Sequence, residues 1–199
     1  MANSSLSFLN LQNDWFFAEK LQNTGAGRNY GIDLTLEKYM SKGYYYMLTG
    51  SFFKSEYKGG DGVWRNTRYN RNYVFNFLTG KEWQVGKSNQ NTLSINVRAT
   101  YQGGNRYSPI NNAASNYSKE VVFDETKAFS MQFDPALNVH FTASYRINKR
   151  KNSREIALKI VNLTRQPDYN GFKYNLINNK IDLDNPSSII PNLTYKIEF

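Results

Sequence analysis

Cysteine is absent from the 199-residue chain, and histidine occurs once, at His140. Without cysteine the chain forms neither a disulfide framework nor a cysteine-based zinc site. No run in the chain approaches the roughly 18 apolar residues of a transmembrane helix. The N-terminal "MANSSLSFLN" lacks the basic start and the apolar stretch of a signal peptide. We therefore expect either a cytoplasmic chain or one whose true N-terminus lies further upstream.

Aromatic residues and positive charge are abundant. Phe, Tyr and Trp make up 16% of the chain, with 15 Tyr and 13 Phe, and the formal net charge is +9. Disordered chains are poor in aromatic residues, so we expect a folded protein. The positive charge keeps a nucleic-acid-binding protein among the alternatives, because such proteins carry an excess of Lys and Arg.

Apolar and polar residues alternate with a period of two, which is typical of strands, and no segment has a convincing amphipathic helical pattern. The clearest case lies at residues 92–101, where Leu93, Ile95 and Val97 alternate with polar residues. We predict an all-β, antiparallel fold with seven strands. They cover residues 30–39, 44–57, 72–83, 92–101, 136–147, 155–164 and 192–199. Residues 5–11 form a weaker candidate for an eighth strand.

The connections between these strands alternate in length. Short turns at residues 40–43, 85–90 and 148–153 alternate with long polar loops at 58–71, 102–135 and 165–188. In an antiparallel meander this places every short turn at one end and every long loop at the other. That asymmetry is typical of outer-membrane β-barrels, so the sequence favours a segment of a transmembrane β-barrel over a soluble sheet.

Aromatic residues gather near both ends of the predicted strands. One group, near the short turns, contains Tyr39, Tyr44, Tyr46, Trp83, Tyr145 and Phe199. The other, near the long loops, contains Tyr57, Tyr73 and Tyr101. Two bands with an aliphatic middle resemble the aromatic girdles at the two membrane interfaces. General enrichment of strands in aromatic residues accounts for their number but not for these bands.

The polar face of the predicted strands carries Asn96, Arg98, His140 and Arg146. In a barrel these side chains line the lumen, and in a soluble sheet they face water. An Arg on the lipid face costs about 2–4 kcal/mol at the bilayer midplane, and the predicted apolar stripes contain none there. For His140, no catalytic partner or metal ligand is apparent nearby, so we expect a hydrogen-bonding role.

The chain stops on "NLTYKIEF", an alternating strand that ends on an aromatic residue. Leu193, Tyr195, Ile197 and Phe199 fall on one face, because strand side chains alternate. Soluble domains usually end in a frayed polar tail. Something must therefore hold this strand in place, either a soluble sheet or a barrel wall.

Several segments together resemble TonB-dependent outer-membrane receptors, most closely the group with an N-terminal carboxypeptidase-regulatory-like domain. They are "GAGRNYGIDLTLEKYMSKGYYYMLTGSFFKSEYKGGDGVWRNTRYNRNYVFNFLTGKEW", "NTLSINVRATYQGGNRYSPI", "REIALKIVNLTRQ" and "PNLTYKIEF". The resemblance covers nearly the whole chain. It implies a location in the outer membrane of a Gram-negative bacterium and a 22-stranded barrel filled by a plug. The barrel would be in contact with outer-membrane lipid.

On this resemblance the chain corresponds to the last seven strands, with residues 1–26 an outer-loop remnant and residues 27–199 the barrel segment. Uptake of a small, unidentified ligand is driven in the family by an inner-membrane energy complex, reached through an N-terminal box. The chain has neither that box nor a plug, so we expect it to be transport-incompetent alone. The resemblance also implies that Leu193, Tyr195, Ile197 and Phe199 form the signal read by the barrel-assembly machinery.

Two outer loops contain candidate ligand contacts. "KGGDGVWRNTRYNR" carries Trp64, Arg65, Arg68 and Tyr69, and "GGNRYSP" carries Arg106 and Tyr107. Aromatic rings beside arginines suit anionic or ring-bearing ligands. The alternative is a folded, glycine-rich loop whose arginines pair with nearby acids or lipid phosphates.

Three function classes remain open from the residues alone. The first is a receptor barrel segment, which requires no cofactor, no metal and no nucleic acid. The second is a complete eight-stranded outer-membrane barrel with a structural or adhesion role. The third is a soluble basic β-protein that binds nucleic acid or glycan, with salt-sensitive binding in the nucleic-acid case. An enzyme is not expected, because no nucleophile–base pair or metal-ligand cluster is apparent, and we assign no catalytic residues.

Overall fold

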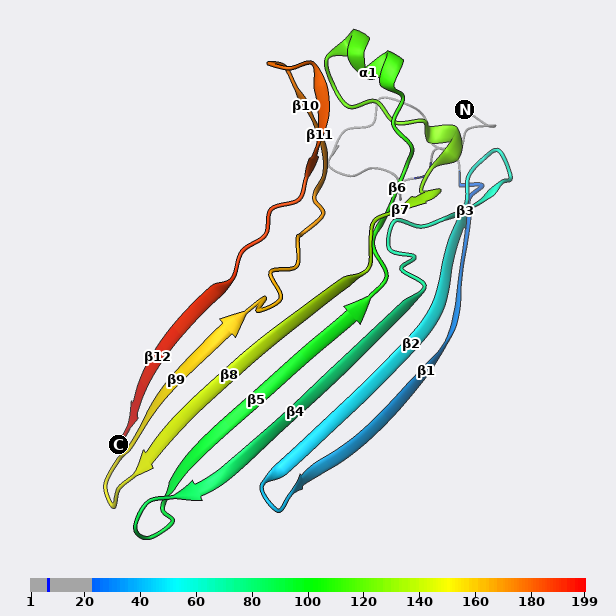
Figure 1. Ribbon diagram of the computed structural model, residues 1–199. Helices are drawn as coiled ribbons and strands as arrows, with labels where there is room; N and C mark the ends of the chain where they lie inside the picture. Colours follow the sequence, from blue (N-terminus) through cyan, green and yellow to red (C-terminus); the bar gives the residue numbers. More distant parts are fainter. Residues whose placement is uncertain (1–6, 8–22) are drawn as a thin grey trace.

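The computed structural model describes residue 7 and residues 23–199, which form one large antiparallel sheet with loops at one end (Figure 1). Consecutive long strands are neighbours throughout, in the order β1-β2-β4-β5-β8-β9-β12. The strands are β1 (Ala26–Ser41), β2 (Tyr44–Lys58), β4 (Tyr73–Val85), β5 (Asn91–Gln102), β8 (Ala136–Asn148), β9 (Ser153–Val161) and β12 (Ile190–Glu198). The predicted all-β antiparallel fold is confirmed. The candidate eighth strand at residues 5–11 lies outside the described residues, except for residue 7.

Tight turns join the strands at one end of the sheet, as the sequence predicts. The β1–β2 turn consists of Lys42 and Gly43, whose φ angles are 53° and 76°. Two positive φ angles are the requirement of a two-residue hairpin turn that follows the twist of its strands, and glycine meets it without steric cost. A β-bulge lies just before this turn, where the register shifts between Lys38 and Ser41.

The long connections at the other end contain small elements that the sequence pattern did not predict. They are β3 (Trp64–Asn66), β6 (Arg106–Tyr107), α1 (Asn112–Ser118), η2 (Glu125–Lys127), β7 (Met131–Gln132), β10 (Gly171–Asn175) and β11 (Lys180–Asp184). Most are too short for a hydrophobic periodicity, and the alternation in β11 covers only five residues. Helix α1 instead depends on its cap, because the Asn111 side chain accepts a hydrogen bond from the Ala114 N–H at 3.1 Å.

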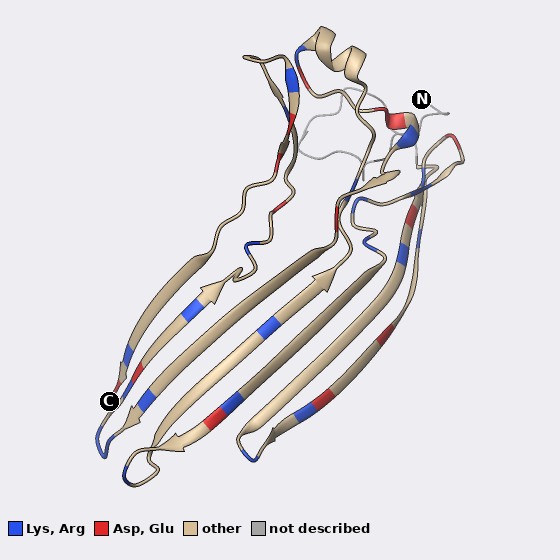
Figure 2. Cartoon of the chain, in the orientation of Figure 1, with Lys and Arg blue, Asp and Glu red and all other residues tan. Residues whose placement is uncertain are grey.

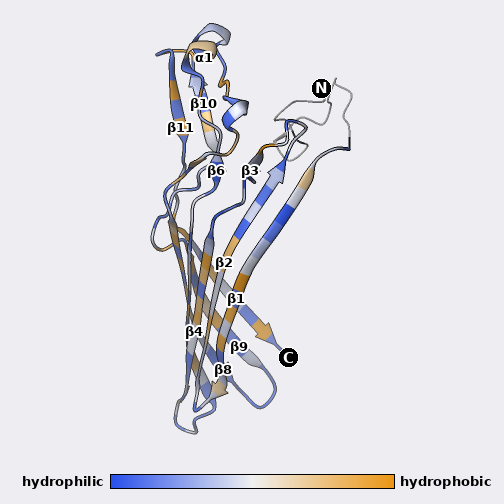
Figure 3. Cartoon of the chain, turned by 90° about the vertical axis from the view of Figure 1, so that its right-hand side faces the viewer, coloured by the Kyte–Doolittle hydropathy of each residue, from blue (hydrophilic) through white to orange (hydrophobic). Residues whose placement is uncertain are grey.

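The strand register gives the sheet two chemically different faces. Residues that are directly opposite each other share a face, so one row reads Leu36, Leu48, Phe77, Ala99 and Val139. We call this the apolar face. Charged residues interrupt the strands at few positions (Figure 2), and β1 changes from hydrophilic near the long loops to hydrophobic further along (Figure 3).

The buried apolar side chains of the described residues gather at the long-loop end, where the end of β2 meets the connection between β5 and β8. They are Tyr57, Ala128 and Phe129, and the rings of Tyr57 and Phe129 meet edge to face at 6.3 Å. By contrast, apolar-face residues such as Ile32, Leu34 and Leu193 are more than 70% exposed. No helix in the described part of the chain is long and apolar enough to cross a membrane.

On the opposite face, a tyrosine ring packs over a glycine of the neighbouring strand. The Tyr45 hydroxyl donates a hydrogen bond to the Asn96 side-chain oxygen at 2.8 Å, two strands away. Between them lies Gly80, where an added Cβ would overlap both the Tyr45 ring and the Asn96 amide. The absence of a side chain at this position therefore permits a contact that ties β2 to β5 across β4.

We expect Gly80→Ala to destabilise the protein by about 1–3 kcal/mol, because the new methyl group displaces the Tyr45 ring and breaks its hydrogen bond. The free energy of unfolding of the purified protein measures this. Gly27→Ala is the matched control, since a Cβ there makes only an ordinary 3.8 Å contact with the Glu56 carbonyl. Equal stability of the two variants would contradict a structural role for the Tyr45–Asn96 contact.

Candidate functional site

The loops that follow β5 and β9 are held together by a stack of aromatic rings. The Phe133 ring centroid lies 4.4 Å from that of Tyr107 and 4.7 Å from that of Tyr169, both in stacked geometry. Phe172, at the start of β10, adds contacts at 5.0 Å to Tyr107 and 5.7 Å to Phe133. Stacked aromatic pairs stabilise beyond the area they bury. This aromatic stack therefore fixes the two loops relative to each other.

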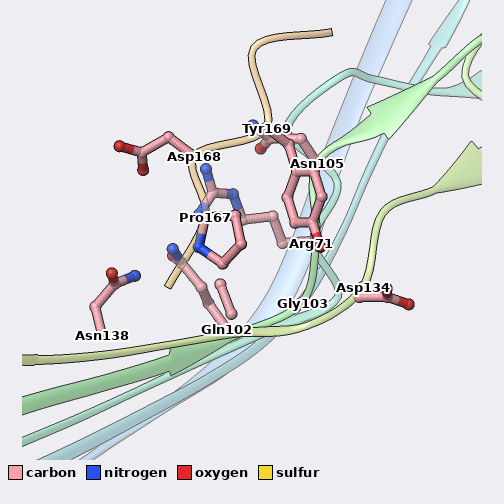
Figure 4. A pocket seen from close by; sticks show the side chains of 11 residues that line it. Arg71, Gln102, Gly103, Asn105, Asp134, Asn138, Pro167, Asp168 and Tyr169 are labelled. Atoms are coloured by element: carbon pink, nitrogen blue, oxygen red, sulfur yellow. The ribbon is translucent and has the colours of Figure 1, made fainter. Parts of the chain in front are cut away.

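A small polar pocket of about 80 Å³ lies where these loops meet the end of the sheet (Figure 4). Three separate connections contribute to it: the one before β4, the one between β5 and β8, and the one after β9. Its lining residues are Arg71, Gln102, Gly103, Gly104, Asn105, Asp134, Ala136, Asn138, Pro167, Asp168 and Tyr169. The Tyr169 ring belongs to both the pocket and the aromatic stack, so the stack positions one wall of the pocket.

The pocket offers donors and acceptors that lack partners among the described residues. No described acid lies within ion-pair distance of Arg71, and burial lowers the pKa of its guanidinium. The Asn105 side-chain oxygen is buried and accepts no hydrogen bond within the described structure. Buried polar atoms normally find a partner. The site therefore suits a small polar group that both accepts and donates hydrogen bonds, such as a hydroxyl or an amide.

Two glycines let the backbones cross closely under this pocket. A Cβ at Gly103 would overlap the Arg71 carbonyl, and one at Gly104 would overlap the Phe133 carbonyl. The Gly103 N–H also donates a hydrogen bond to the Tyr73 carbonyl at 3.1 Å, which joins the end of β5 to the start of β4. The "GG" at the start of the "GGNRYSP" loop thus allows three loops to converge.

Two of the three predicted ligand-contact arginines, Arg65 and Arg106, hold the loops together. The Arg65 guanidinium binds both carboxylate oxygens of Asp61, at 3.0 and 2.7 Å, and also donates to the Thr126 carbonyl. Arg106 donates to the Asn70 carbonyl and to the Asn72 side-chain oxygen, both at 2.9 Å. Both arginines therefore have structural partners, as in the alternative of a folded loop.

The other predicted ligand contacts lie outside the pocket. Tyr107 is part of the aromatic stack. Trp64 packs beneath the Arg28 guanidinium, 4.2 Å from its ring centroid. Arg68 lies over the Tyr69 ring at 5.8 Å, and Tyr69 is 63% exposed. The pocket residues Arg71, Asn105 and Asp168 were not predicted, because they come from different loops and no short motif joins them.

The four predicted lumen residues share the face opposite the apolar one. Arg98 is directly opposite His140, and Asn96 lies in the next row with Thr142 and Lys159. These five residues line a hollow of about 190 Å³. Arg146 lies nearer the short turns on the same face, where it forms an ion pair with Glu198 and donates to the Ser153 hydroxyl at 3.1 Å. The short turns also contain Lys and Arg residues, which form no ion pair with a described acid.

Most of the predicted aromatic bands lie on the apolar face. The register puts six of the nine residues there: Tyr44, Tyr46, Trp83, Tyr145, Tyr73 and Tyr101. Tyr57 departs from the predicted band, because it lies on the opposite face and is 1% exposed against Phe129. Tyr39 lies within the register shift that precedes the first turn.

The final strand keeps the predicted alternation. Leu193, Tyr195 and Ile197 are opposite Leu158, Ile156 and Arg154 of β9, which places all three on the apolar face. They are exposed, and Phe199, which follows β12, is 99% exposed. β12 pairs on one side only within the described sheet, so its other edge presents free backbone groups.

No cluster of three or more His, Asp or Glu side chains in residues 23–199 is arranged to hold a metal ion. The pocket contains a guanidinium, two carboxylates and three amides, which suit binding by hydrogen bonds. It contains no serine, cysteine or histidine, the side chains that most often act as a nucleophile or its base.

Phe133→Ala should release the loop at residues 165–188 from the rest of the loop assembly. Of the three aromatic contacts that the ring makes, those to Tyr169 and Phe172 reach this loop, so we expect a loss of about 2 kcal/mol in local stability. Limited proteolysis within residues 165–188 reports it directly. Tyr117→Ala serves as the control, because Tyr117 is 94% exposed. Unchanged cleavage in Phe133→Ala would show that the stack does not hold the loop.

The loop around Asp61 should become more mobile in acid. The Arg65 guanidinium holds the pKa of the Asp61 carboxyl below its ordinary value of 3.8, so this carboxylate stabilises the folded loop at neutral pH. That stabilisation is lost as the pH falls through the lowered pKa, when the carboxyl is protonated. Hydrogen exchange of residues 59–66 should accelerate below about pH 4 relative to the intrinsic rate. In Asp61→Asn the loop should exchange fast both at neutral pH and below about pH 4. If exchange in this variant still accelerated in acid, Asp61 would not be the responsible group.

The comparison with known proteins leaves the site to be interpreted from its own residues. No protein-family model matches the chain, and neither a curated protein nor a solved structure does. The pocket, the apolar face and the loop asymmetry are therefore the features on which a function has to be based.

Proposed function

We propose that this chain forms part of the barrel wall and outer loops of a TonB-dependent outer-membrane receptor. Its ligand is a small, unidentified molecule taken up by energy-coupled transport. The observation that carries the proposal is the continuous apolar face of the sheet, uncharged in its middle and exposed. Among outer-membrane barrels, we choose this receptor family because the sequence resembles it.

Charge on the apolar face is confined to its two ends. Near the long loops the face carries Arg28, Lys54, Glu56 and Lys58, and near the short turns it carries Lys38, Lys81 and Arg154. Between these groups every strand presents uncharged residues, mostly aliphatic or aromatic. The Lys38 ammonium lies 3.5 Å from the centroid of the Tyr44 ring. Cations beside tyrosines at the edge of an apolar band are typical of a membrane interface, where long side chains reach toward water.

The apolar band crosses the sheet diagonally, as a tilted barrel wall requires. Leu34, the middle of the apolar stripe on β1, is in register with Leu137 on β8. Tyr195, the middle of the stripe on β12, is in register with Tyr145. The band thus shifts by eight residues over six strand steps. With about 3.3 Å per residue and about 4.8 Å between strands, this corresponds to a tilt of roughly 40°. Strands of outer-membrane barrels tilt by a similar angle.

The two edge strands support a wall within a larger barrel. β1 and β12 pair on one side only in the described sheet. In a bilayer, unpaired backbone groups are costly, so both edges require further strands. The plug and the coupling to the inner-membrane energy complex then belong to other parts of the receptor. The exposed apolar β12 is the surface offered to the barrel-assembly machinery, and the polar pocket lies at the outer mouth, where a ligand arrives.

A lysine placed on the apolar face tests this proposal. Leu48→Lys puts a charge in the middle of the band, where we expect a cost of about 2–4 kcal/mol and a strong loss of protein assembled in the outer membrane. Ser51→Lys is the matched control on the same strand, because it faces the opposite side, beside Asp33. Membrane fractionation and heat-modifiable gel mobility measure assembly.

The two outcomes separate the function classes. Loss of assembly for Leu48→Lys alone supports a lipid-facing band. If both lysine variants accumulate normally as a soluble protein, the receptor proposal is wrong, and a soluble basic β-protein takes its place.

A further inference from the structure

A cluster of four charged residues lies on the apolar face, directly beyond the aliphatic band at the long-loop end. From the band outward, β1 and β2 present the register pairs Ile32 with Phe52, Tyr30 with Lys54, and Arg28 with Glu56. Lys58 follows, opposite Trp64 of β3. The order is aliphatic, then aromatic, then cationic. We call Arg28, Lys54, Glu56 and Lys58 the rim cluster.

The single acid of the rim cluster is shared by two cations. The Arg28 Nη2 atom lies 2.7 Å from Glu56 Oε2, and the Lys54 Nζ atom lies 2.8 Å from Glu56 Oε1. The Glu56 side chain is 8% exposed, whereas those of Arg28 and Lys54 are 46% and 44% exposed. The carboxylate therefore anchors the two cations while their remaining donors face outward. Three cations against one acid leave the cluster with an excess of positive charge.

Trp64 orients the cations from the other side. The Arg28 guanidinium carbon lies 4.2 Å from the Trp64 ring centroid, and the Lys58 ammonium lies 5.5 Å from it. Cations over an indole ring are attracted by its electron-rich face. The Arg28 and Lys58 side chains are thus held on one exposed surface, where an arriving anion meets a pre-positioned set of donors.

We propose that the rim cluster binds the phosphate groups of lipid headgroups in the outer leaflet of the membrane. The inference rests on the proposed function, which puts this part of the apolar face at headgroup level. Guanidinium and ammonium groups are the usual partners of phosphate. Tyr30 lies beside Lys54 at the inner end of the rim cluster, and Trp64 lies opposite Lys58 at its outer end. Aromatic side chains beside cations favour the membrane interface. A phosphorylated glycolipid is the occupant that matches both the charge excess and this position.

The test uses the protein purified from outer membranes in mild detergent, with bisphosphorylated lipid A as the probe and dephosphorylated lipid A as its counterpart. Lys58→Gln removes one cation and keeps the Arg28–Glu56–Lys54 pairs intact, so the fold is retained. We expect its affinity for the phosphorylated probe to be about fivefold lower, as for one basic side chain near an anionic surface. Lys38→Gln, on the same face at the other end of the sheet, is the control and should leave the affinity unchanged.

Each result decides the proposal. Selective weakening in Lys58→Gln, with weak binding of the dephosphorylated probe by the unmodified protein, supports it. Equal affinity of Lys58→Gln and the unmodified protein overturns it, as does equal binding of the two probes. Displacement of lipid A by an equimolar amount of inorganic phosphate would assign the cluster to free phosphate instead. A protein found outside the outer membrane would overturn the receptor proposal and the headgroup site together, whereas membrane assembly without headgroup binding would overturn the site alone.

Discussion

The antiparallel backbone ladder is the constraint on which the rest of this structure depends. It fixes which residues are opposite each other, and the period of two then sends each to one of two faces. A slip of one residue in any strand would move Leu34, Leu48 or Phe77 to the face that carries Arg98 and His140. The apolar face, the diagonal band, the rim cluster and the opposite polar face all follow from this one register.

The ladder also explains why the small secondary-structure elements lie in the long loops. Short turns such as Lys42 and Gly43 leave no room for further elements, so the small strands and α1 all lie in the long connections. There the backbone needs new partners, which it finds in the Asp61–Arg65 pair, the Arg106 contacts and the aromatic stack around Phe133. The polar pocket with Arg71 and Asn105 is a consequence of that convergence. In the proposed receptor, a rigid wall thus supports an assembly of loops that meets the ligand.

The strands and their faces could be predicted from the sequence, because alternation is a local signal. All seven predicted strands are present. Residues such as Val97 and Tyr145 could be assigned to a face because alternate positions along a strand point to the same side. The pocket could not be predicted, because its residues are far apart in the chain and meet only through three loops. Tyr57 shows a further limit. Its place near the end of a strand gave no sign that Phe129, 72 residues later, would cover it.

The most direct test of the account is the lipid exposure of alternate residues along β4. The chain contains no cysteine, so a nitroxide can be placed at one new cysteine at a time over residues 75–79, in the membrane-embedded protein. Collision with oxygen reports lipid, and collision with a water-soluble nickel complex reports water. The account predicts oxygen accessibility with a period of two, highest at positions 75, 77 and 79. Accessibility without that period, or free access of the nickel complex to position 77, would contradict a lipid-facing sheet.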